Sequence, residues 1–485
     1  MKLSNILNGI DLIEVTGGSP EMCEITGICF DSRCCTPGSL FIAQRGSASD
    51  GHLFINAALE SGAAAVLCEE MPSERSNGVV IKIKDTHSAL GIASSNFYDR
   101  PSEKMKVVGI TGTNGKTTTA TLLFRVFRAL GYKCGLLSTI ANYIEEREVS
   151  ATHTTPDPVQ LNRLMAEMAF EGCEFCFMEV SSHSLDQKRV AGIEFAGGLF
   201  SNITHDHLDY HKTFAEYIRV KKSFFDNLSP NSFALTNVDD KNGMVMLQNS
   251  AASKYTYSCQ SPANFNCRII ESTLDGMLLN IGGKEVWTRF IGGHNAYNIL
   301  AVYSAAILLG AKEDELLVEI SNLSSVAGRL EYLKGGEEIT AVVDYAHTPD
   351  ALENVLKTLK DCAEGKEIVT VFGCGGNRDK TKRSEMAEVS ARYSDRVVVT
   401  SDNPRFEEPE AIIDDIRKGF SVKDMGKTLF ITDRREAIRT ALIMAKPGSI
   451  VLIAGKGHEN YQDVKGVKHH FDDKEEINNL FNQKS

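Results

Sequence analysis

The sequence predicts an α/β protein of three domains, and three observations support this prediction. The chain has 485 residues, which is too long for one core and suggests about three domains of roughly 150 residues each. Apolar runs typical of buried strands alternate with amphipathic helical segments. This alternation indicates mostly parallel sheets covered by helices on both faces. Several of the apolar runs end in loops rich in Gly, Asp or His, which is where open α/β sheets bind ligands.

Residues 1–102 are predicted to form the first and smallest domain, itself α/β. Its strand-like runs, "SLFIAQRG", "AAAVLCEE" and "GVVIKIKD", end at the polar, proline-containing joint "YDRPSEK". Asn5, Asn8 and Asp11 interrupt the apolar run at the N-terminus, which argues against a secretory signal. No run approaches the ~18 apolar residues that a membrane helix needs. We therefore expect a cytoplasmic protein that has no membrane partner.

The remaining residues are predicted to form two larger domains. Residues 103–332 begin with a strand, a glycine-rich loop and an amphipathic helix, so we expect a central domain with a P-loop-type, mostly parallel sheet. Residues 333–485 repeat the alternation of strands and helices, and we expect a Rossmann-like domain. Its predicted strands lie in "ITAVVDYAH", "KEIVTVFGCGG", "DRVVVTSDNP", "KTLFITD" and "SIVLIAGKG".

Charge and cysteine content narrow the class of protein. The formal net charge is -12, from 52 Lys and Arg against 64 Asp and Glu, which does not favour a nucleic-acid partner. The 12 cysteines show no repeated metal spacing. The pair Cys173 and Cys176 in "CEFC" could be a redox or half-zinc motif, but "FCFMEV" is better interpreted as a buried strand in which Cys176 is a small apolar residue.

The stretch "VVGITGTNGKTTTATLLFRVFRALG", residues 107–131, predicts a phosphate-binding loop between a strand and a helix. In the common loop, G-x-x-x-x-G-K-[ST], a glycine stands where this chain has Ile110. A tight turn without a ligand is the alternative. We favour a variant nucleotide loop, because its backbone N–H groups and the helix dipole attract phosphate. Lys116 could then reach the outer phosphates, and Thr117 or Thr118 could bind Mg²⁺.

Acidic and histidine side chains follow two further predicted strands. In "FMEVSSHS", Glu179 ends a strand at the position where P-loop enzymes keep a metal carboxylate. "SNITHDHLDYH" adds His207 and four neighbouring acidic or histidine residues. A zinc site is conceivable, but neither a Cys nor a Glu-x-x-His pattern completes it. A nucleotide-Mg²⁺ site fits these residues better.

Two loops of the third predicted domain contain candidate ligand-binding residues. "VFGCGGNRDK" is not a dinucleotide fingerprint, because Arg378 stands where the last glycine is required, and we therefore discount NAD. Asp402 to Arg405 in "TSDNPRFEE" could be an ordinary Asx-Pro turn. An Arg beside an Asp would also suit a ligand with both a carboxylate and an ammonium group. "AGKGHENYQ" ends another strand and could lie close by.

Together these motifs resemble the Mur ligase family, the ATP-dependent amide ligases of peptidoglycan synthesis. The resemblance rests on "TGTNGKTTT", "EVSSHSLDQKRV", "NITHDHLDYH", "GGHNAYN", "GRLE", "VDYAHTPDAL", "DNPR" and "GKGHE", and it extends from "FDSRCCTPGSLFIAQRGSASDGH" to the C-terminus. It implies three domains, which bind a UDP-sugar peptide, ATP and the incoming amino acid. It also implies small-molecule substrates, no nucleic-acid partner and a monomer. The family form of the loop lacks the first glycine, which accounts for Ile110.

The resemblance implies a role for specific residues in the first two domains. Catalysis would use Lys116, Glu179, His207 and Lys221. The resemblance implies two Mg²⁺ ions, whose ligands would be Thr117, Glu179, His207 and Lys221 as a carbamate, with Lys222 as a neighbouring alternative. ATP would be bound by Gly112, Thr113, Asn114, Gly115, Lys116, Thr117, Thr118, Asn295 and Arg329. The UDP-sugar peptide would be bound by Phe30, Ser32, Ser47, Ala48, Ser49, His153, Thr154, Thr155, Ser181, Gln187 and Arg189.

In the third domain the resemblance implies a pocket for meso-2,6-diaminopimelate. Its residues would be Arg378, Asp402, Asn403, Pro404, Arg405, Gly455 and Glu459. Asn377 and Ser384 depart from the family pattern, which often has Asp and Pro there.

The implied reaction phosphorylates the D-glutamyl carboxylate of UDP-N-acetylmuramoyl-L-alanyl-D-glutamate with ATP, and the amine of diaminopimelate then attacks the acyl phosphate. A lysine-adding or folylpolyglutamate-type ligase is an alternative. So is a P-loop ATPase that acts as a regulatory or binding module.

Overall fold

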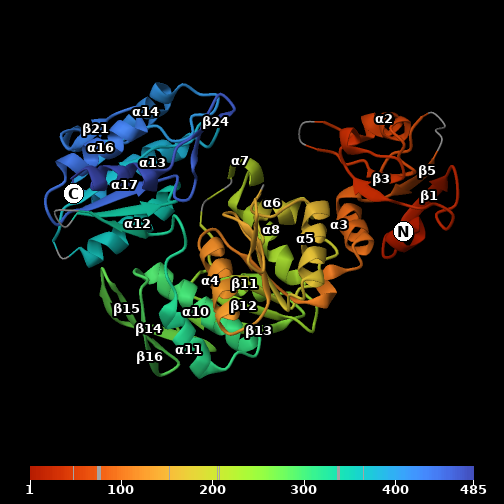
Figure 1. The fold of residues 1–485 in the computed structure, drawn as a ribbon, viewed down its shortest axis with the longest axis horizontal. Helices are drawn as coiled ribbons and strands as arrows, with labels where there is room; N and C mark the ends of the chain where they lie inside the picture. The colour runs from red at the N-terminus through yellow and green to blue at the C-terminus, as the bar shows by residue number, and fades with distance from the viewer. Residues whose placement is uncertain are drawn as a thin grey trace.

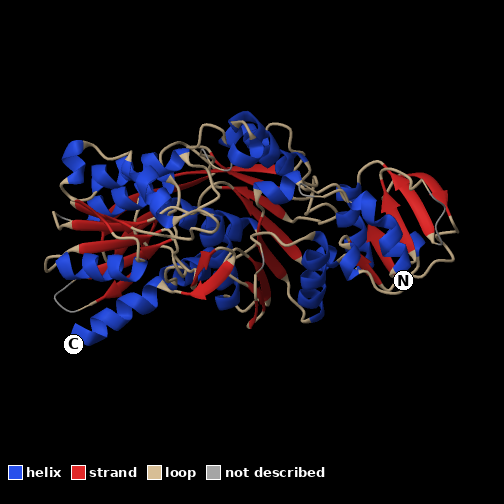
Figure 2. Ribbon diagram, turned by 90° about the horizontal axis from the view of Figure 1, so that it is seen from above, coloured by secondary structure: helices blue, strands red, loops and turns tan. Residues whose placement is uncertain are grey.

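The computed structural model describes residues 1–46, 49–73, 78–151, 153–204, 206, 208–335, 339–363 and 365–484. Three helix-covered sheets follow one another along the chain. The sheets nearest the N-terminus and the C-terminus lie at opposite ends of the molecule, with the largest sheet between them (Figures 1 and 2). We refer to them as the first, central and third units. The predicted α/β class with mostly parallel sheets is confirmed.

The first unit contains a five-stranded sheet in the order β1-β5-β4-β3-β2. Only β1 is antiparallel to its neighbour. The strands are β1 (Leu12–Thr16), β2 (Gly27–Cys29), β3 (Ser39–Ile42), β4 (Ala65–Cys68) and β5 (Val79–Ile83), and the helices are α1 (Leu3–Ile6), α2 (Ile55–Glu60) and α3 (Thr86–Phe97). Short 3-10 turns are η1 (Ser32–Cys34), η2 (Gly51–Phe54) and η3 (Pro101–Lys104).

The central unit contains an eleven-stranded sheet in the order β16-β15-β14-β13-β12-β11-β6-β10-β7-β8-β9. Its middle strands are parallel: β6 (Lys106–Thr111), β7 (Cys134–Leu137), β10 (Phe175–Glu179), β11 (Gly197–Phe200), β12 (Phe233–Asn237) and β13 (Ser253–Ser258). The outer strands are β8 (Asn142–Ile144), β9 (Arg147–Val149), β14 (Phe265–Thr273), β15 (Gly276–Ile281) and β16 (Lys284–Thr288).

Helices cover both faces of the central sheet, as the alternation predicted. Val108 and Ile110 of β6 pack in one core with α4 (Lys116–Ala129), α10 (Gly293–Leu308) and α11 (Glu313–Asn322). Val107 points to the opposite core, because successive side chains of a strand alternate between faces. That second core contains side chains of α5 (Pro158–Phe170), α8 (Phe214–Asp226) and α9 (Gly243–Leu247), while α6 (Ser182–Asp186) and α7 (Leu208–His211) pack beside α8.

The "CEFC" segment belongs to the core of the central sheet. Cys176 lies in β10, its side chain is 0% exposed, and Cys173 is also buried. Both pack in the core beside α5 and α8. The interpretation of "FCFMEV" as a buried strand is therefore confirmed.

The third unit contains a six-stranded sheet in the order β17-β18-β22-β19-β20-β21, parallel except for β17. The strands are β17 (Glu331–Lys334), β18 (Thr340–Asp344), β19 (Ile368–Phe372), β20 (Arg396–Val399), β21 (Thr428–Phe430) and β22 (Ile450–Ala454), with a separate hairpin of β23 (Tyr461–Val464) and β24 (Val467–His470). The proposed domain boundary at 332 therefore falls within β17.

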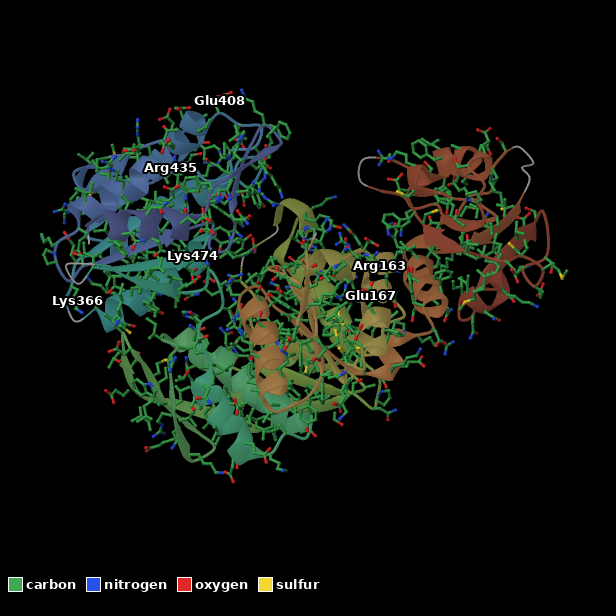
Figure 3. The ribbon with its side chains drawn as sticks, in the orientation of Figure 1. Arg163, Glu167, Lys366, Glu408, Arg435 and Lys474 are labelled. Atoms are coloured by element: carbon green, nitrogen blue, oxygen red, sulfur yellow. The ribbon has the colours of Figure 1, made fainter. Side chains whose placement is uncertain are left out.

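Two layers of helices enclose the third sheet. One core contains side chains of α12 (Pro349–Cys362), α13 (Thr381–Tyr393) and α14 (Pro409–Arg417). The other contains α16 (Arg434–Met444) and α17 (Asp473–Lys484), and the short α15 (Val422–Met425) precedes β21. Charged side chains such as Lys366, Glu408 and Arg435 project from the outside of this unit (Figure 3).

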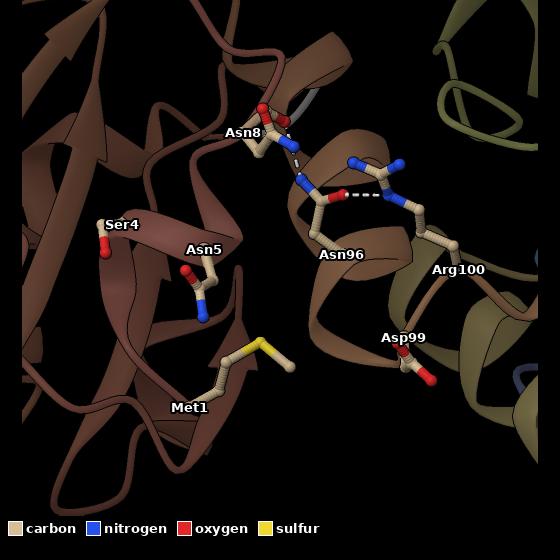
Figure 4. Close-up of a pocket in the computed structure, with 7 residues that line it drawn as sticks. All are labelled: Met1, Ser4, Asn5, Asn8, Asn96, Asp99 and Arg100. Carbon is tan, nitrogen blue, oxygen red and sulfur yellow. Dashed lines mark hydrogen bonds between the residues drawn. The ribbon is translucent and has the colours of Figure 1, made fainter.

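The first and central units are joined at the predicted linker "YDRPSEK". Asp99 and Arg100 both adopt left-handed backbone angles, with φ of 61° and 47°, which non-glycine residues rarely adopt. Arg100 Nε donates to Asn96 Oδ1 at 3.2 Å, and Asn96 in turn donates to the backbone of α1 and its following turn (Figure 4). A cavity of about 360 Å³ lies at this joint, lined by Met1, Ser4, Asn5, Asn8, Asn96, Asp99 and Arg100, none of which is a predicted site residue.

Within the part of the chain that the structure describes, no helix is long and apolar enough to span a bilayer.

Candidate active site

The glycine-rich loop connects β6 to α4 and is shaped by two glycines. Gly112 and Gly115 have φ of 149° and 87°, and a Cβ atom would lie 2.0 Å from Ser201 Oγ or 2.4 Å from Asn298 Oδ1, respectively. Both positions therefore require glycine. Ile110 lies fully buried inside β6, and its carbonyl accepts a hydrogen bond from Val180 N at 2.8 Å. Position 110 is thus a strand position that needs no glycine.

Lys116 begins α4 and turns back over the loop. Its Nζ donates to the carbonyl oxygens of Gly112 at 3.0 Å and Thr113 at 2.8 Å. Burial lowers the pKa of Lys116, while the carboxylates of Glu179 and Asp206 act in the opposite direction. A cation held among loop carbonyls at a helix N-terminus is positioned to meet the outer phosphates of a nucleotide.

Glu179 ends β10, next to the loop, because β10 pairs in parallel with β6 and Glu179 is in register with Ile110. Its side chain is 0% exposed. Thr139 holds both carboxylate oxygens: its N donates to Oε1 at 2.7 Å and its Oγ1 to Oε2 at 3.1 Å. A buried carboxylate at the carboxyl end of parallel strands suits a divalent cation.

Lys221 approaches the same loop from α8. Its side chain is 1% exposed, and its Nζ donates to Gly112 O at 2.8 Å and lies 4.8 Å from the ring centre of Tyr217. Burial, together with the nearby charge of Lys116, lowers the pKa of Lys221 well below its ordinary value. Lys222 points elsewhere and pairs with Asp226 at 2.6 Å on the same helix. The geometry thus places Lys221, and not Lys222, at the loop.

The histidine-containing segment follows β11, on the other side of β6. His207 lies outside the described residues, so its predicted metal role stays a prediction. Its neighbour Asp206 is buried and forms an ion pair with Lys382 of α13, Nζ to Oδ1 at 2.6 Å. Thr204 Oγ1 donates to Asp350 Oδ2 at 3.2 Å. Both partners belong to the third unit, which therefore contacts the central unit beside the phosphate loop.

Asn295 and Arg329 lie on the α4 side of the loop. Asn295 accepts a hydrogen bond from Asn298 at 3.0 Å, and Asn298 lies directly behind Gly115. Arg329 Nη2 is 3.5 Å from Thr117 Oγ1, and its guanidinium stacks 4.7 Å from the ring centre of Tyr345. Its buried Nε has no hydrogen-bond partner among the described residues. An unsatisfied donor beside a glycine cradle fits an anionic ligand such as a triphosphate.

The residues predicted to line the path of the sugar and peptide form one network around Glu179. Thr155 Oγ1 donates to Glu179 O at 2.8 Å, and Arg189 Nη1 donates to Thr155 O at 2.8 Å. Arg189 also holds Gln187 Oε1, with Nε at 3.0 Å and Nη2 at 2.7 Å. Thr154 bonds to Thr139, Ser181 caps α6 and His153 is exposed on the adjoining loop.

The remaining predicted residues for the UDP moiety lie in the first unit. Phe30 is 38% exposed and Ser32 begins η1, just after β2. Ser49 is exposed and its carbonyl accepts from Gly46 N at 3.0 Å. Ser47 and Ala48 lie outside the described residues. An ion pair between Asp85 and Lys188 connects this unit to the central one.

The predicted amino-acid pocket gathers where β20 and β22 end. Asp402, Asn403 and Pro404 are buried, and Asn403 Nδ2 donates to Glu459 Oε2 at 2.7 Å. A Cβ on Gly455 would lie 2.4 Å from Asp402 Oδ2, so glycine is required there. The structure therefore brings the "DNPR" and "GKGHE" segments together.

Two arginines lie at the edge of this pocket. Arg405 has a φ of 51°, and its Nη1 donates to Gly376 O at 2.8 Å. Arg378 is exposed in the loop after β19. Asn377 has a φ of 53°, and its Oδ1 accepts from Phe406 N at 3.1 Å. Asn and Asp both tolerate this conformation, so the departure at position 377 preserves the loop.

Sequence reasoning missed several residues that shape these sites. Thr139 orients Glu179, and Asp350 connects the third unit to the loop segments. Lys456, fully buried within "GKGHE", donates to Asn403 Oδ1 at 3.3 Å and Glu459 Oε2 at 3.4 Å. Lys456 lies in "GKGHE" and Asp350 lies in "HTPDAL", so their position in these motifs was the available signal.

Comparison with known proteins finds similarity to Mur ligases in all three units of the chain. The Mur ligase family catalytic domain matches residues 24–98, the Mur ligase middle domain residues 110–306, and the Mur ligase glutamate ligase domain residues 328–457. The chain is 55% identical over 483 residues to a UDP-N-acetylmuramoyl-L-alanyl-D-glutamate--2,6-diaminopimelate ligase of Bacteroides fragilis, with 99% of each chain covered. It is 42% identical to the ligase of the same name from Clostridioides difficile, again with 99% of each covered.

A solved structure with the same ligase name superposes with a TM-score of 0.71 at 31% identity and covers 100% of this chain and 99% of that chain. The fold, the three matching domains in order and the identity over full length lead to one conclusion. This chain belongs to the Mur ligase family.

Proposed function

We propose that the protein is an ATP-dependent amide ligase that adds meso-2,6-diaminopimelate to UDP-N-acetylmuramoyl-L-alanyl-D-glutamate in peptidoglycan precursor synthesis. One observation carries the proposal: Lys116 and Lys221, from two helices, both donate to Gly112 O, at 3.0 and 2.8 Å, beside the buried Glu179. Two buried lysines and a carboxylate that converge on a phosphate loop suit the transfer of a phosphoryl group to an anionic acceptor. The names of the close relatives support the substrates.

The central unit supplies the phosphoryl-transfer step. The carboxylate of the UDP-dipeptide attacks the γ-phosphorus of ATP, the bond to the β-phosphate oxygen breaks, and an acyl phosphate and ADP result. Lys116 and Arg329 lie where they can offset the negative charge of the two approaching anions. Glu179, with Thr117, His207 and Lys221, would hold Mg²⁺, which when bound polarises the phosphoryl oxygens and neutralises their charge.

Lys221 is proposed to act as a carbamate. Because burial lowers its pKa well below the ordinary value, its amine is more readily available in the neutral form that reacts with CO₂. The nitrogen bonds to the carbon of CO₂ and loses one proton, which leaves a carboxylate-like group. That change replaces a buried cation beside Lys116 by an anion that can ligate a metal, and so removes the repulsion between the two lysines.

The third unit is proposed to bind the amino-acid acceptor. Asp402 and Glu459 can receive its ammonium group, while Arg405 and Arg378 can pair with carboxylate. Asn403 and the buried Lys456 hold the Glu459 carboxylate in place. A free amine of the bound acceptor then attacks the acyl carbon, and phosphate leaves. Arg405 favours diaminopimelate over lysine, because lysine lacks the far carboxylate.

The proposed arrangement needs the acceptor and the acyl phosphate to meet across two units. Residues 1–102, 103–332 and 333–485 are the proposed domains for the UDP-sugar peptide, ATP and the amino acid. Movement of the third domain toward the central one would bring the amine to the acyl carbon. We further propose that the protein acts as a cytoplasmic monomer.

An acceptor-specificity assay tests the function. Purified protein with ATP, Mg²⁺ and the UDP-dipeptide is offered diaminopimelate, lysine or glutamate, and the UDP-tripeptide is quantified by mass spectrometry. We expect product with diaminopimelate and little with the other two. A lysine or glutamate product would support the lysine-adding or folylpolyglutamate-type alternative. ATP hydrolysis that does not depend on the UDP-dipeptide would support a regulatory ATPase.

A further inference from the structure

Two cysteine thiols lie side by side at the end of β2 in the first unit. Cys29 Sγ and Cys35 Sγ are 2.9 Å apart. Cys29 is the last residue of β2 and is 7% exposed, whereas Cys35 follows η1 and is partly exposed. Because a disulfide bond is about 2.05 Å long, the two sulfur atoms need to approach by only about 0.9 Å to form one.

The local fold holds this pair together. Cys29 packs in a core cluster with Phe41 and Ile55, and Cys35 packs against the same cluster. Asp31 caps the intervening turn by accepting a hydrogen bond from Arg33 N at 3.0 Å. The turn therefore returns the chain to the end of β2, where the two thiols lie next to each other.

The two thiols differ in their access to solvent oxidants. Burial, together with the neighbouring Cys35, raises the pKa of Cys29 to about 12. The thiolate is the form that reacts with oxidants in solution, so Cys29 is protected from them by its ionisation state and by the core around it. Its reaction with Cys35 depends instead on contact, because Cys35 Sγ lies 2.9 Å away. Cys35 is the member of the pair that a small oxidant in solution can reach first.

We propose that Cys29 and Cys35 form a modification site for hydroperoxides, in which Cys29 resolves an oxidised Cys35. In the first step the Cys35 thiolate attacks one peroxide oxygen, the O–O bond breaks, and Cys35 sulfenic acid and hydroxide form. In the second step Cys29 Sγ attacks Cys35 Sγ and the S–O bond breaks, and the departing hydroxide takes the Cys29 proton. Two thiols are oxidised to one disulfide while hydrogen peroxide is reduced to two waters.

The site would protect the turn that contains Phe30 and Ser32 from irreversible oxidation at Cys35. The benefit to UDP binding rests on the role proposed for Phe30 and Ser32 above. Closing the disulfide needs only a small movement of the turn, because the sulfur atoms are already 2.9 Å apart. Without Cys29, further oxidation would convert Cys35 to a charged sulfinic acid packed against the core cluster, and this change is not reversed by thiols. The pair thus limits oxidation to a step that a thiol can reverse.

Peptide mass spectrometry of the full-length protein tests the proposal. Wild type, Cys29→Ser and the matched control Cys34→Ser, which removes the exposed neighbouring thiol, are treated with hydrogen peroxide and then with dithiothreitol. We expect a Cys29–Cys35 cross-linked peptide in wild type and Cys34→Ser, which disappears on reduction. In Cys29→Ser we expect sulfinic or sulfonic acid at Cys35 that persists, with the KM for the UDP-dipeptide raised about tenfold and the KM for ATP unchanged.

Two results would overturn the proposal. One is the absence of the cross-link in wild type at peroxide levels that oxidise Cys34. The other is full recovery of Cys29→Ser on reduction, with no persistent acid at Cys35. The cross-link is read without any assay of ligation. If it forms in a protein that makes no UDP-tripeptide, the proposed function fails and the modification site stands.

Discussion

Asp350 Oδ2, in the first turn of α12, accepts a hydrogen bond of 3.0 Å from Asn114 Nδ2 in the phosphate loop. The same oxygen accepts from Thr204 Oγ1 at 3.2 Å. One carboxylate of the third unit therefore holds both segments that lead into the proposed metal site. Burial raises the pKa of Asp350 above its ordinary value, while these two donors favour the ionised form.

Replacing Asp350 by Ala tests whether this contact couples the two units. Asn202 still holds the loop through the backbone of Thr113 and Asn114, so we expect ATP to bind with a KM within about threefold of wild type. We expect kcat for ligation to fall about 10- to 100-fold, because the third unit is no longer held in position against the phosphate loop. Steady-state kinetics with each substrate varied in turn measures both values.

The matched control for this change is Glu353→Ala, one turn along α12. Glu353 pairs with Lys357 and Tyr393 inside the third unit and touches neither loop segment. We expect its kcat to remain close to wild type. An equal loss in both variants would mean that α12 matters only for folding.

Lys221 and Lys222 are adjacent in sequence and differ sharply in position. We expect Lys221→Ala to lose about 100-fold or more in kcat, because a group at the phosphoryl-transfer site disappears. Lys222→Ala removes a partly exposed pair with Asp226 and should stay within about twofold of wild type. Carbon-13 NMR of protein incubated with labelled bicarbonate should give a carbamate signal in wild type and Lys222→Ala. A carbamate signal that persists in Lys221→Ala would refute the assignment.

Arg405 should decide which diamino acid is accepted. A charge-assisted pair is worth about 1.5–3 kcal/mol, so Arg405→Lys should raise the KM for diaminopimelate about 10- to 100-fold. Lysine, which has no far carboxylate, should be affected much less. Lys465→Ala, an exposed charge that pairs with Glu408, is the control and should change neither value. Equal losses for diaminopimelate and lysine would remove Arg405 from the specificity pocket.

Glu407 should contribute to stability in a defined pH range. Arg383, only 1% exposed, holds its carboxylate at 2.9 Å, and this bond lowers the pKa of Glu407 to about 2 from its ordinary 4.5. A carboxyl group whose pKa is lower in the folded than in the unfolded protein stabilises the folded state at pH values above its unfolded pKa. For Glu407 this contribution is lost as the pH falls from 4.5 toward 2.

The substitution Glu407→Gln measures this contribution. We expect the free energy of unfolding at pH 7 to fall by about 1–2 kcal/mol, a value reduced because Glu407 lies near the surface. The difference from wild type should shrink as the pH is lowered from 5 to 3. Glu408→Gln, at an exposed neighbouring position, should be neutral at every pH. A difference that does not depend on pH would point to lost packing instead of lost charge.

Much of the fold follows from the sequence alone. Alternating burial on a strand and the 3.6-residue period of a helix are local properties, so the parallel α/β class and the buried strand at Cys176 could be predicted from the residues. The glycine loop was also a local signal, because strand, turn and helix are contiguous in the chain. Its two glycines are required by contacts with Ser201 and Asn298, which no local pattern reveals.

Tertiary structure alone decided which side chains meet. The sequence left Lys221 and Lys222 as alternatives, and the packing of α8 against the loop separates them, since only one face of a helix points inward. Tertiary packing also brings Asp350 into contact with Asn114, 236 residues away in the sequence. It likewise places Lys456 in contact with the carboxylate of Glu459. Such contacts depend on how sheets and helices stack, which is a property of the whole fold. The sequence determined the class of protein and its motifs, and the packing decided which residues can act together.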